Sequence, residues 1–426
     1  MHDTNLLEDQ PIAWTPTPEV IERARLTQFM KQVGVSTWDE LYEFSIRDVE
    51  KFTEEVLKFL DIKFDPPYEK LLDTSNGVEF PKWFVSEPPA SAGGQEVDSD
   101  STNWPPAHAG GSDLSAGLNI TAMCLDRWQT DEMRDQPAVI WEGEDSAHWH
   151  WTYEELLEQV EFCASGLRYN GIKKGDAVGI HLPMTQDIVT ILLAIGRIGA
   201  IAVPVFSGYG VEAIASRMNA VGAKAIFICT GFPRRGKLVD SYAIAKEAIT
   251  NCPTIRKVIV RDTIGSDPEF SDNRFENWHD FLSFDYVVKG GAGWHEMQYA
   301  EPTSAEDPLI ILYTSGTTGK PKGIAHTHAS FPIKAAQDMA FGTDVGKGTR
   351  ISWYTDIGWM MGPWLIYGAL INGATICIYD GAPDYPTPDR MWEFCAKHKV
   401  EVLGISPTLV RALAAHEQSV PPAVAG

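Results

Sequence analysis

The sequence predicts an α/β protein in which helices cover one or two mostly parallel, doubly wound sheets. The chain has 426 residues, 44% of them hydrophobic, which is enough to bury at least two substantial cores. From Trp151 onward, short apolar runs typical of strands alternate with stretches of helical periodicity. Because roughly a helix length separates the runs, each connection can cross back over the sheet and place the next strand parallel to the last.

The first 87 residues are predicted to form an N-terminal helical cap. Helix signals run over residues 18–61, among them Thr37 followed three residues later by Glu40, a candidate capping box. Apolar side chains recur at helical spacing near the end of this stretch, at Phe52, Val56, Phe59 and Leu60. We therefore expect helices that bury one face against the rest of the protein.

A segment of different composition follows the cap. Between residues 88 and 117 Gly, Ser, Pro and Asp dominate, and the few apolar side chains cannot offset the entropy lost on ordering. We predict a disordered insertion over 88–117 and a main domain over 118–426. The string PPASAGG at Pro88 nearly recurs as PPAHAGG at Pro105 and as PPAVAG at Pro421, which suggests inserted sequence and a reading frame cut at the last copy.

The main domain opens with elements that alternate in type. Thr152 and Glu155 are predicted to cap a helix, and a strand over 177–182, a helix over 187–198 and a strand over 200–205 follow. Further apolar runs typical of buried strands lie at 224–229, 257–260, 309–313, 375–379 and 400–405. In such folds ligands bind where the strands end at their carboxyl edge.

The charge balance excludes one class of partner. The chain carries 35 Lys and Arg against 58 Asp and Glu, a formal net charge of −23. Such a surface repels a polyphosphate backbone, so nucleic acid is not an expected partner. An anionic substrate must be held by a local cluster of cations and backbone N–H groups.

The cysteines and the N-terminus predict a soluble cytoplasmic protein. The six cysteines are far apart, form no CxxC pair and stand mostly in apolar runs, as buried reduced thiols do. The acidic start lacks a signal-peptide pattern, and no apolar run is long enough to span a membrane. His148 and His150 could face one way on a strand, but no third ligand is near, so no metal site is predicted.

The strongest motif is YTSGTTGKPKG at residues 313–323, directly after an apolar strand. Its glycines, among them Gly316 and Gly319, permit tight turns that bring backbone N–H groups close to an anion. Lys320 and Lys322 supply positive charge. Hydroxyl groups that can donate to phosphate oxygens are those of Thr314, Ser315, Thr317 and Thr318. The motif therefore predicts a phosphate-binding loop.

This loop differs from the P-loop of common NTPases. That motif has Gly five positions before its Gly-Lys pair and Ser or Thr after it, where this chain has Thr314 and Pro321. Pro321 also prevents a helix from continuing through the loop, which we expect to be long and mobile. The alternative interpretation is a flexible surface loop without a ligand.

The loop resembles the signature loop of the adenylate-forming superfamily, which handles the β- and γ-phosphates of ATP. Four further strings resemble the acetyl-CoA-synthetase-like branch: WTYEEL at 151–156, VPVFSGYG at 203–210, WYTDIGWMMGP at 353–363 and YDGAPDYPTPDRMW at 379–392. The resemblance implies the large N-terminal domain of an AMP-forming acyl-CoA synthetase, with two doubly wound sheet subdomains. It implies ATP, Mg²⁺ and coenzyme A as cofactors, a carboxylic acid as substrate, and catalytic contacts by Lys320 and Thr317.

A basic turn follows the strand over 224–229. In the resembled branch a turn in this place contacts the 3′-phosphate of CoA, which implies a CoA role for Arg234, Arg235 and Lys237. The alternative is a solvated loop between strand and helix.

The string WYTDIGWMMGP is implied to form the acyl pocket, with Trp359, Met360 and Met361 in its wall. Acetate enzymes typically carry smaller residues after the Trp, so two methionines indicate an adaptable apolar wall and a substrate that need not be acetate. The alternative is that all three side chains are ordinary core.

Several parts of the resembled family have no counterpart in the sequence. These are the adenine segment, a Tyr-Gly-x-Thr-Glu motif, the ribose Asp, the hinge and the small C-terminal domain with its lysine. We therefore expect a domain incomplete at its C-terminus, and three interpretations stay open. The chain is an impaired fragment of a ligase, half of a split ligase that needs a second chain, or a nucleotide- or CoA-binding protein without ligase activity.

Overall fold

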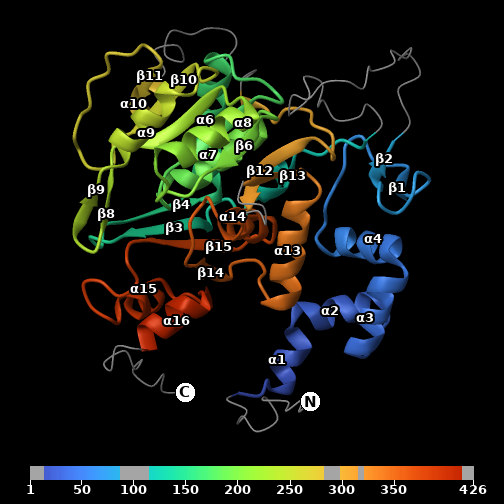
Figure 1. The fold of residues 1–426 in the computed structure, drawn as a ribbon. Coiled ribbons are helices and arrows are strands. Elements are labelled where there is room, and N and C mark those ends of the chain that lie inside the picture. Colours follow the sequence, from blue (N-terminus) through green and yellow to red (C-terminus); the bar gives the residue numbers. More distant parts are fainter. Residues whose placement is uncertain (1–13, 87–114, 283–297, 315–320, 415–426) are drawn as a thin grey trace, which may run out of the picture.

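The computed structural model describes residues 14–86, 115–282, 298–314 and 321–414 (Figure 1). Two sheets dominate it, and the first has seven strands in the order β11-β10-β7-β5-β6-β12-β13. The strands are β5 (Ala177–His181), β6 (Ile201–Pro204), β7 (Ala225–Cys229), β10 (Lys257–Arg261), β11 (Phe275–Asn277), β12 (Pro308–Thr314) and β13 (Lys322–Thr327). Every neighbouring pair is parallel except β12 and β13, which are antiparallel.

Helices cover both faces of this sheet. They are α6 (Tyr153–Tyr169), α7 (Asp187–Arg197), α8 (Val211–Val221), α9 (Ser241–Thr250) and α10 (Trp278–Leu282). Alternate residues of β5 and β7 face opposite sides: Phe227 packs in the core with α6 and α7, whereas Ile226 packs with α8 and α9. The predicted doubly wound arrangement is therefore confirmed.

The second sheet has five strands in the order β16-β14-β15-β3-β4. They are β3 (Pro137–Gly143), β4 (His148–Thr152), β14 (Arg350–Trp353), β15 (Thr375–Asp380) and β16 (Val402–Gly404). Four strands are parallel, and β4 runs antiparallel to β3 at one edge. Its helices are α13 (Phe331–Gly342), α14 (Met361–Ile371), α15 (Arg390–His398) and α16 (Pro407–Ala414). Ile376 packs in the core with α14, and Cys377 packs on the other face with α15.

The N-terminal cap consists of α1 (Pro18–Arg23), α2 (Arg25–Val33), α3 (Trp38–Arg47) and α4 (Val49–Phe59), followed by the hairpin of β1 (Lys70–Asp73) and β2 (Lys82–Val85). The predicted capping box is present: Glu40 N donates to Thr37 Oγ1 at 3.2 Å, and Thr37 N donates to Glu40 Oε2 at 3.0 Å. Phe29 of α2 stacks on Phe341 of α13 with ring centroids 4.5 Å apart. The helical cap therefore packs directly on the main domain, beside α13 in Figure 1.

Most of the predicted insertion at 88–117 lies outside the described residues, but its last three residues are part of the fold. Ala116 is fully buried, and its N–H donates to the Phe84 carbonyl at 2.8 Å. A side chain at Gly117 would collide with the backbone carbonyl of Asp65, so glycine is required there. Backbone pairing thus orders these residues despite their composition.

Three further predictions can be compared with the structure. Thr152 and Glu155 form the second capping box, at the start of α6. All six cysteines are free thiols, five of them buried. None of the described helices is both long enough and apolar enough to cross a bilayer.

Candidate active site

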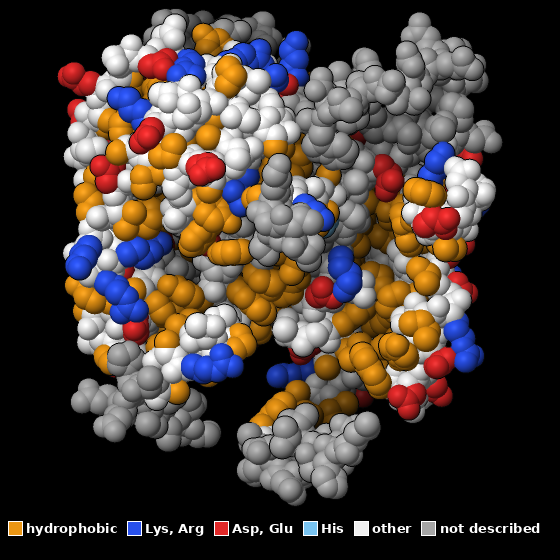
Figure 2. Space-filling view, viewed as in Figure 1, with side chains coloured by type: hydrophobic (Ala, Val, Ile, Leu, Met, Phe, Trp, Pro, Cys, Tyr) orange, Lys and Arg blue, Asp and Glu red, His pale blue; other side chains and the backbone are white. Residues whose placement is uncertain are grey.

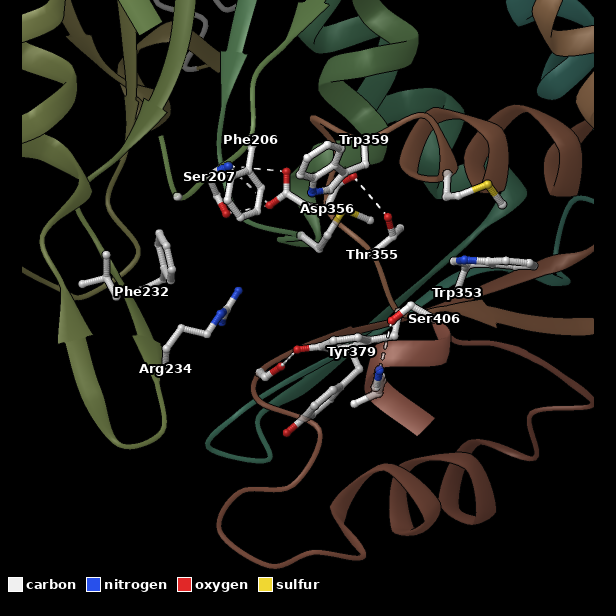
Figure 3. Close-up of a pocket in the computed structure, with 17 residues that line it drawn as sticks. Phe206, Ser207, Phe232, Arg234, Trp353, Thr355, Asp356, Trp359, Tyr379 and Ser406 are labelled. Atoms are coloured by element: carbon white, nitrogen blue, oxygen red, sulfur yellow. Dashed lines mark hydrogen bonds between the residues drawn. The ribbon is translucent and has the colours of Figure 1, made fainter. Parts of the chain in front are cut away.

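One pocket of about 640 Å³ lies where the carboxyl edges of the two sheets face each other (Figure 3). From the first sheet it receives the residues after β6 and the hairpin that follows β7. From the second it receives residues at or after the ends of β14, β15 and β16. Its lining consists of Met184, Phe206, Ser207, Gly208, Phe232, Arg234, Val239, Trp353, Tyr354, Thr355, Asp356, Trp359, Met361, Tyr379, Gly381, Ser406 and Leu409.

A buried carboxylate joins the two sheets on one side of the pocket. Asp356, after β14, accepts hydrogen bonds from Ser207 Oγ at 2.6 Å and from Gly358 N at 2.8 Å. The chain approaches so closely that a Cβ on Gly358 would lie 2.1 Å from the backbone nitrogen of Phe206. Phe206 also packs on Trp359, with ring centroids 5.5 Å apart. This corner is consequently fixed by backbone packing as well as by hydrogen bonds.

The basic turn forms the opposite side, as the hairpin of β8 (Phe232–Arg234) and β9 (Lys237–Val239). Both turn residues have positive φ, 53° at Arg235 and 69° at Gly236. The buried Glu144 accepts hydrogen bonds from their N–H groups at 3.0 and 2.8 Å. Burial raises the pKa of Glu144, but these two donors, the N–H of Ala382 and the charge of Arg234 together lower it more, so the carboxylate stays charged and holds the turn.

The three predicted CoA residues occupy different places on this hairpin. Arg234 lines the pocket, and its guanidinium pairs with the buried Asp380 at 2.5 Å. Arg235 is exposed and pairs with Asp384 at 2.7 Å, while Lys237 is also exposed. Figure 2 shows Lys and Arg side chains gathered over this hairpin, at the left of the view. The hairpin therefore presents positive charge both inside the pocket and on the surface beside it.

The acyl motif is divided between pocket and surface. Trp359 and Met361 line the pocket, whereas Met360 does not and has 57% of its surface exposed. The reason is geometric: Met360 is the N-cap of α14, and consecutive residues at a helix start point in directions about 100° apart. Neither Trp359 nor Met360 is ordinary core, since Trp359 is 50% exposed.

The predicted phosphate loop is flanked by two antiparallel strands, β12 and β13. Ser315, Gly316, Thr317, Thr318, Gly319 and Lys320 lie outside the described residues. Thr314 ends β12, Lys322 begins β13, and the two are paired in register. β12 also pairs with β6, which leads directly into the pocket residues Phe206 and Ser207. The flanks of the loop thus lie at the same sheet edge as the pocket.

Comparison with known proteins decides the family. The sequence profile described as AMP-binding enzyme matches residues 126–424, well over half of the chain. The chain belongs to the AMP-binding enzyme family. A second profile, described as acetyl-coenzyme A synthetase N-terminus, matches residues 38–86, which lie within the helical cap. The resemblance inferred from the motifs is therefore confirmed.

Relatives of this AMP-binding enzyme include several acetyl-coenzyme A synthetases. The protein of Chlorobaculum tepidum is 38% identical over 69% of this chain and 43% of its own length. That of Methanothrix soehngenii is 33% identical over 96% of this chain and 56% of its own length. That of Nostoc linckia is 39% identical over 70% of this chain and 86% of its own length. The chain thus spans about half the length of the first two.

A solved structure is similar over nearly the whole chain. Acetoacetyl-CoA synthetase from Streptomyces lividans superposes with a TM-score of 0.78 and 26% sequence identity, covering 94% of this chain and 56% of that one. The architecture of two doubly wound sheets is therefore that of the large N-terminal part of an acyl-CoA synthetase.

Sequence reasoning missed several residues that line the pocket of this AMP-binding enzyme or hold its shape. Ser207, Asp356, Tyr379 and Ser406 line it, and Asp380 pairs with Arg234. All but Ser406 stand in strings already singled out, and Tyr379, Asp380 and Ser406 stand at the end of a predicted strand or directly after one. Their position at carboxyl ends of parallel strands was a usable signal.

The buried Asp356 gives a prediction for stability. Burial raises its pKa to about 6, from an ordinary value near 4. The folded state therefore binds the proton more tightly than the unfolded state, so this group lowers the free energy of unfolding as pH rises from about 4 to about 6. Over that range we expect the wild type to lose up to about 3 kcal/mol of its free energy of unfolding through this group. Asp356→Asn is neutral throughout and should not show this loss. Urea unfolding of both proteins at several pH values measures it, and parallel pH curves for the two proteins would contradict it.

Proposed function

We propose that this chain is the ATP-, acid- and CoA-binding part of an AMP-forming acyl-CoA synthetase. The observation that carries the proposal is the shared pocket, which Arg234 of the basic hairpin lines together with Trp359 and Met361 of the acyl motif (Figure 3). Thioester formation requires the CoA thiol and the activated acid to meet in one place. Thr314 and Lys322, which flank the proposed phosphate loop, are paired at the end of β12, at the same sheet edge as the pocket.

The proposed chemistry has two steps. A carboxylate oxygen attacks the α-phosphorus of ATP, giving acyl-AMP and releasing pyrophosphate. The CoA thiol then loses its proton and attacks the acyl carbonyl carbon, giving the thioester and releasing AMP. Neither step needs a protein nucleophile, so the chain contributes alignment and charge placed where negative charge develops.

The residues of the chain have distinct proposed roles. Loop residues 314–322, with Lys320 and Thr317 foremost, bind the β- and γ-phosphates. Arg234, Arg235 and Lys237 bind the phosphates of CoA. Mg²⁺ would enter bound to the ATP phosphates and neutralise part of their charge. We assign it no ligand from this chain, and the described residues contain no group of three or more potential metal-binding side chains.

The acid is proposed to be larger than acetate. Several aromatic rings line the pocket, and Met361 adds a flexible thioether that adapts to different shapes. The cysteines bear on the proposed cytoplasmic location. The free, mostly buried thiols support it.

Exchange of labelled pyrophosphate into ATP tests the function. We propose to measure the exchange with a panel of carboxylic acids, first with the chain alone. The measurement is then repeated with a second chain that corresponds to the region of the relatives that this chain does not cover. Exchange by the chain alone supports an active ligase, and exchange only on mixing supports a split one. Nucleotide binding without exchange in either case favours the third interpretation, a nucleotide- or CoA-binding protein, and contradicts the proposal.

The basic hairpin gives a second prediction. We expect Lys237→Gln to raise the KM for CoA by about tenfold, since a charge-assisted hydrogen bond to phosphate contributes about 1.5–3 kcal/mol. The rate of acyl-AMP formation should not change, because the first step does not use CoA. Lys246→Gln on α9 is the control. If Lys237→Gln leaves the KM for CoA unchanged, Lys237 does not contact CoA, and the alternative of a solvated hairpin is favoured.

A further inference from the structure

A second pocket lies between the N-terminal cap and the end of α14, and shares none of its described lining residues with the first. Its volume is about 330 Å³. Four cationic side chains from separate chain segments line it, namely Arg25, Lys63, Arg127 and Lys347. Asp61 is the single carboxylate among its described lining residues. In a chain of net charge −23, this concentration of positive charge is unusual.

Both arginines line this pocket, and their guanidinium groups donate to neutral oxygen acceptors. Arg25 Nη2 donates to Asn372 Oδ1 at 3.1 Å. Arg127 Nη1 donates to the Leu60 and Asp61 carbonyls at 3.1 and 3.2 Å, and Arg127 Nη2 donates to the Ile371 carbonyl. Among the described residues, no carboxylate forms an ion pair with either guanidinium. Each also keeps a buried Nε–H that no described group accepts.

Burial lowers the pKa of both arginines, and the positive charge of Arg127 lowers that of Arg25 further. Asp344 opposes this effect on Arg25, although its carboxylate is bonded to the Arg25 backbone N–H at 2.7 Å. Holding two guanidinium groups together costs free energy, and an anion between them would recover it.

The two lysines form the exposed part of the pocket. Lys63 lies 3.4 Å from Asp61, and Lys347 lies 3.5 Å from Glu132, all of them largely exposed. Exposed pairs of this kind contribute at most about 1 kcal/mol, so either lysine can exchange its partner for a ligand.

The aromatic side chains of the pocket hold cations in place. Arg25 lies 5.0 Å from the centroid of the Phe59 ring, and Arg127 lies 4.4 Å from that of Trp128. Lys347 lies 5.6 Å from the same Trp128 ring. Because cations already occupy these ring faces, the faces are not free to stack on a ligand. A ligand would therefore contact the cations themselves.

We propose that this pocket binds a compact phosphate or polyphosphate anion. Two planar guanidinium groups and two ammonium groups offer more donors than the two oxygens of a monocarboxylate can accept. A phosphoryl group has three oxygens and nearly two charges, which suits this set. Arg25 and Lys63 belong to the cap, whereas Arg127 and Lys347 belong to the main domain. The bound anion therefore joins the two parts of the protein.

The experiment titrates the whole chain with inorganic phosphate, inorganic pyrophosphate and AMP by calorimetry. All proteins carry Lys320→Ala, which weakens the phosphate loop and isolates the second pocket. The test variant is the double replacement Lys63→Gln and Lys347→Gln, because both side chains are exposed and their loss does not threaten folding. The matched control is Lys58→Gln, an exposed lysine of α4 that lies 3.9 Å from Glu55 and does not line the pocket.

We expect the double variant to bind pyrophosphate at least about tenfold more weakly, and Lys58→Gln to bind it normally. Pyrophosphate should raise the Tm of the parent protein and of Lys58→Gln but not that of the double variant. AMP can also bind the first pocket, so only the part of its binding that the double variant loses is assigned to the second pocket. If that part is tighter than the binding of phosphate, the ligand is a phosphate ester, and if the two are equal, it is the free anion. Unchanged affinity and unchanged Tm shift in the double variant would overturn the proposal, as would the absence of binding by the parent.

Discussion

Replacing Glu142 with glutamine is expected to destabilise the protein by about 3–5 kcal/mol, the cost of breaking a buried ion pair on one side. Glu142 is the last residue but one of β3 in the second sheet and is only 1% exposed. Its carboxylate contacts Arg390, and it also lies 2.7 Å from Lys397 Nζ and 2.6 Å from His398 Nε2. Arg390 is itself 4% exposed, so without Glu142 it holds an uncompensated buried charge.

The pH dependence of this loss has a defined sign. Burial raises the pKa of Glu142, but hydrogen bonds from Lys397, Arg390 and His398 lower it more, so the folded pKa is below the ordinary value. The stability that the carboxylate contributes is thus complete above the ordinary pKa of glutamate and is lost as pH falls through the folded pKa. The difference between wild type and Glu142→Gln should shrink in acid.

Urea unfolding at pH 7 and at acidic pH measures both effects. The control is Glu43→Gln, which removes an exposed ion pair to Arg47 within α3 and should cost under about 0.5 kcal/mol. A Glu142→Gln protein as stable as this control would show that the buried network contributes specificity of structure and not stability.

The local elements of this fold could be predicted from the sequence because their signals are local. The capping boxes of Thr37 and Thr152 are each complete within four residues, and both are present. The buried strands could be located because parallel strands are apolar on both faces. Backbone pairing across long sequence separation was not predictable: the order of residues 115–117 depends on Phe84 and Ala305, far away in the chain.

The candidate site was predictable only in part, for the same reason. Arg234 and Trp359 were singled out separately, yet nothing local indicates that they line one pocket. The ion pair between Arg234 and Asp380 depends on the two sheets facing each other, so it cannot be predicted from the composition of either segment. Met360 and Met361 are adjacent in sequence, and only the position of the helix start decides which of them enters the pocket.

The phosphate loop carries the largest expected functional effect. In a preparation that exchanges pyrophosphate, Lys320→Ala should lower the exchange rate by about 10²–10³-fold, the range for removing one group that stabilises developing charge. The loop spans residues 315–320 between Thr314 and Lys322, whose pairing keeps its two ends together at the edge beside β6.

The matched control for Lys320 is Lys334→Ala on α13, an exposed lysine paired with Asp338 that shares no strand with the loop. Its exchange rate should equal that of the wild type. A charge that acts on the transition state lowers kcat, whereas one that only holds ATP raises KM, so the two constants measured separately distinguish stabilisation from binding. If Lys320→Ala exchanges as fast as Lys334→Ala, the hairpin carries no phosphate contact by this lysine, and the pocket at the facing sheet edges must draw its ATP-binding charge from elsewhere.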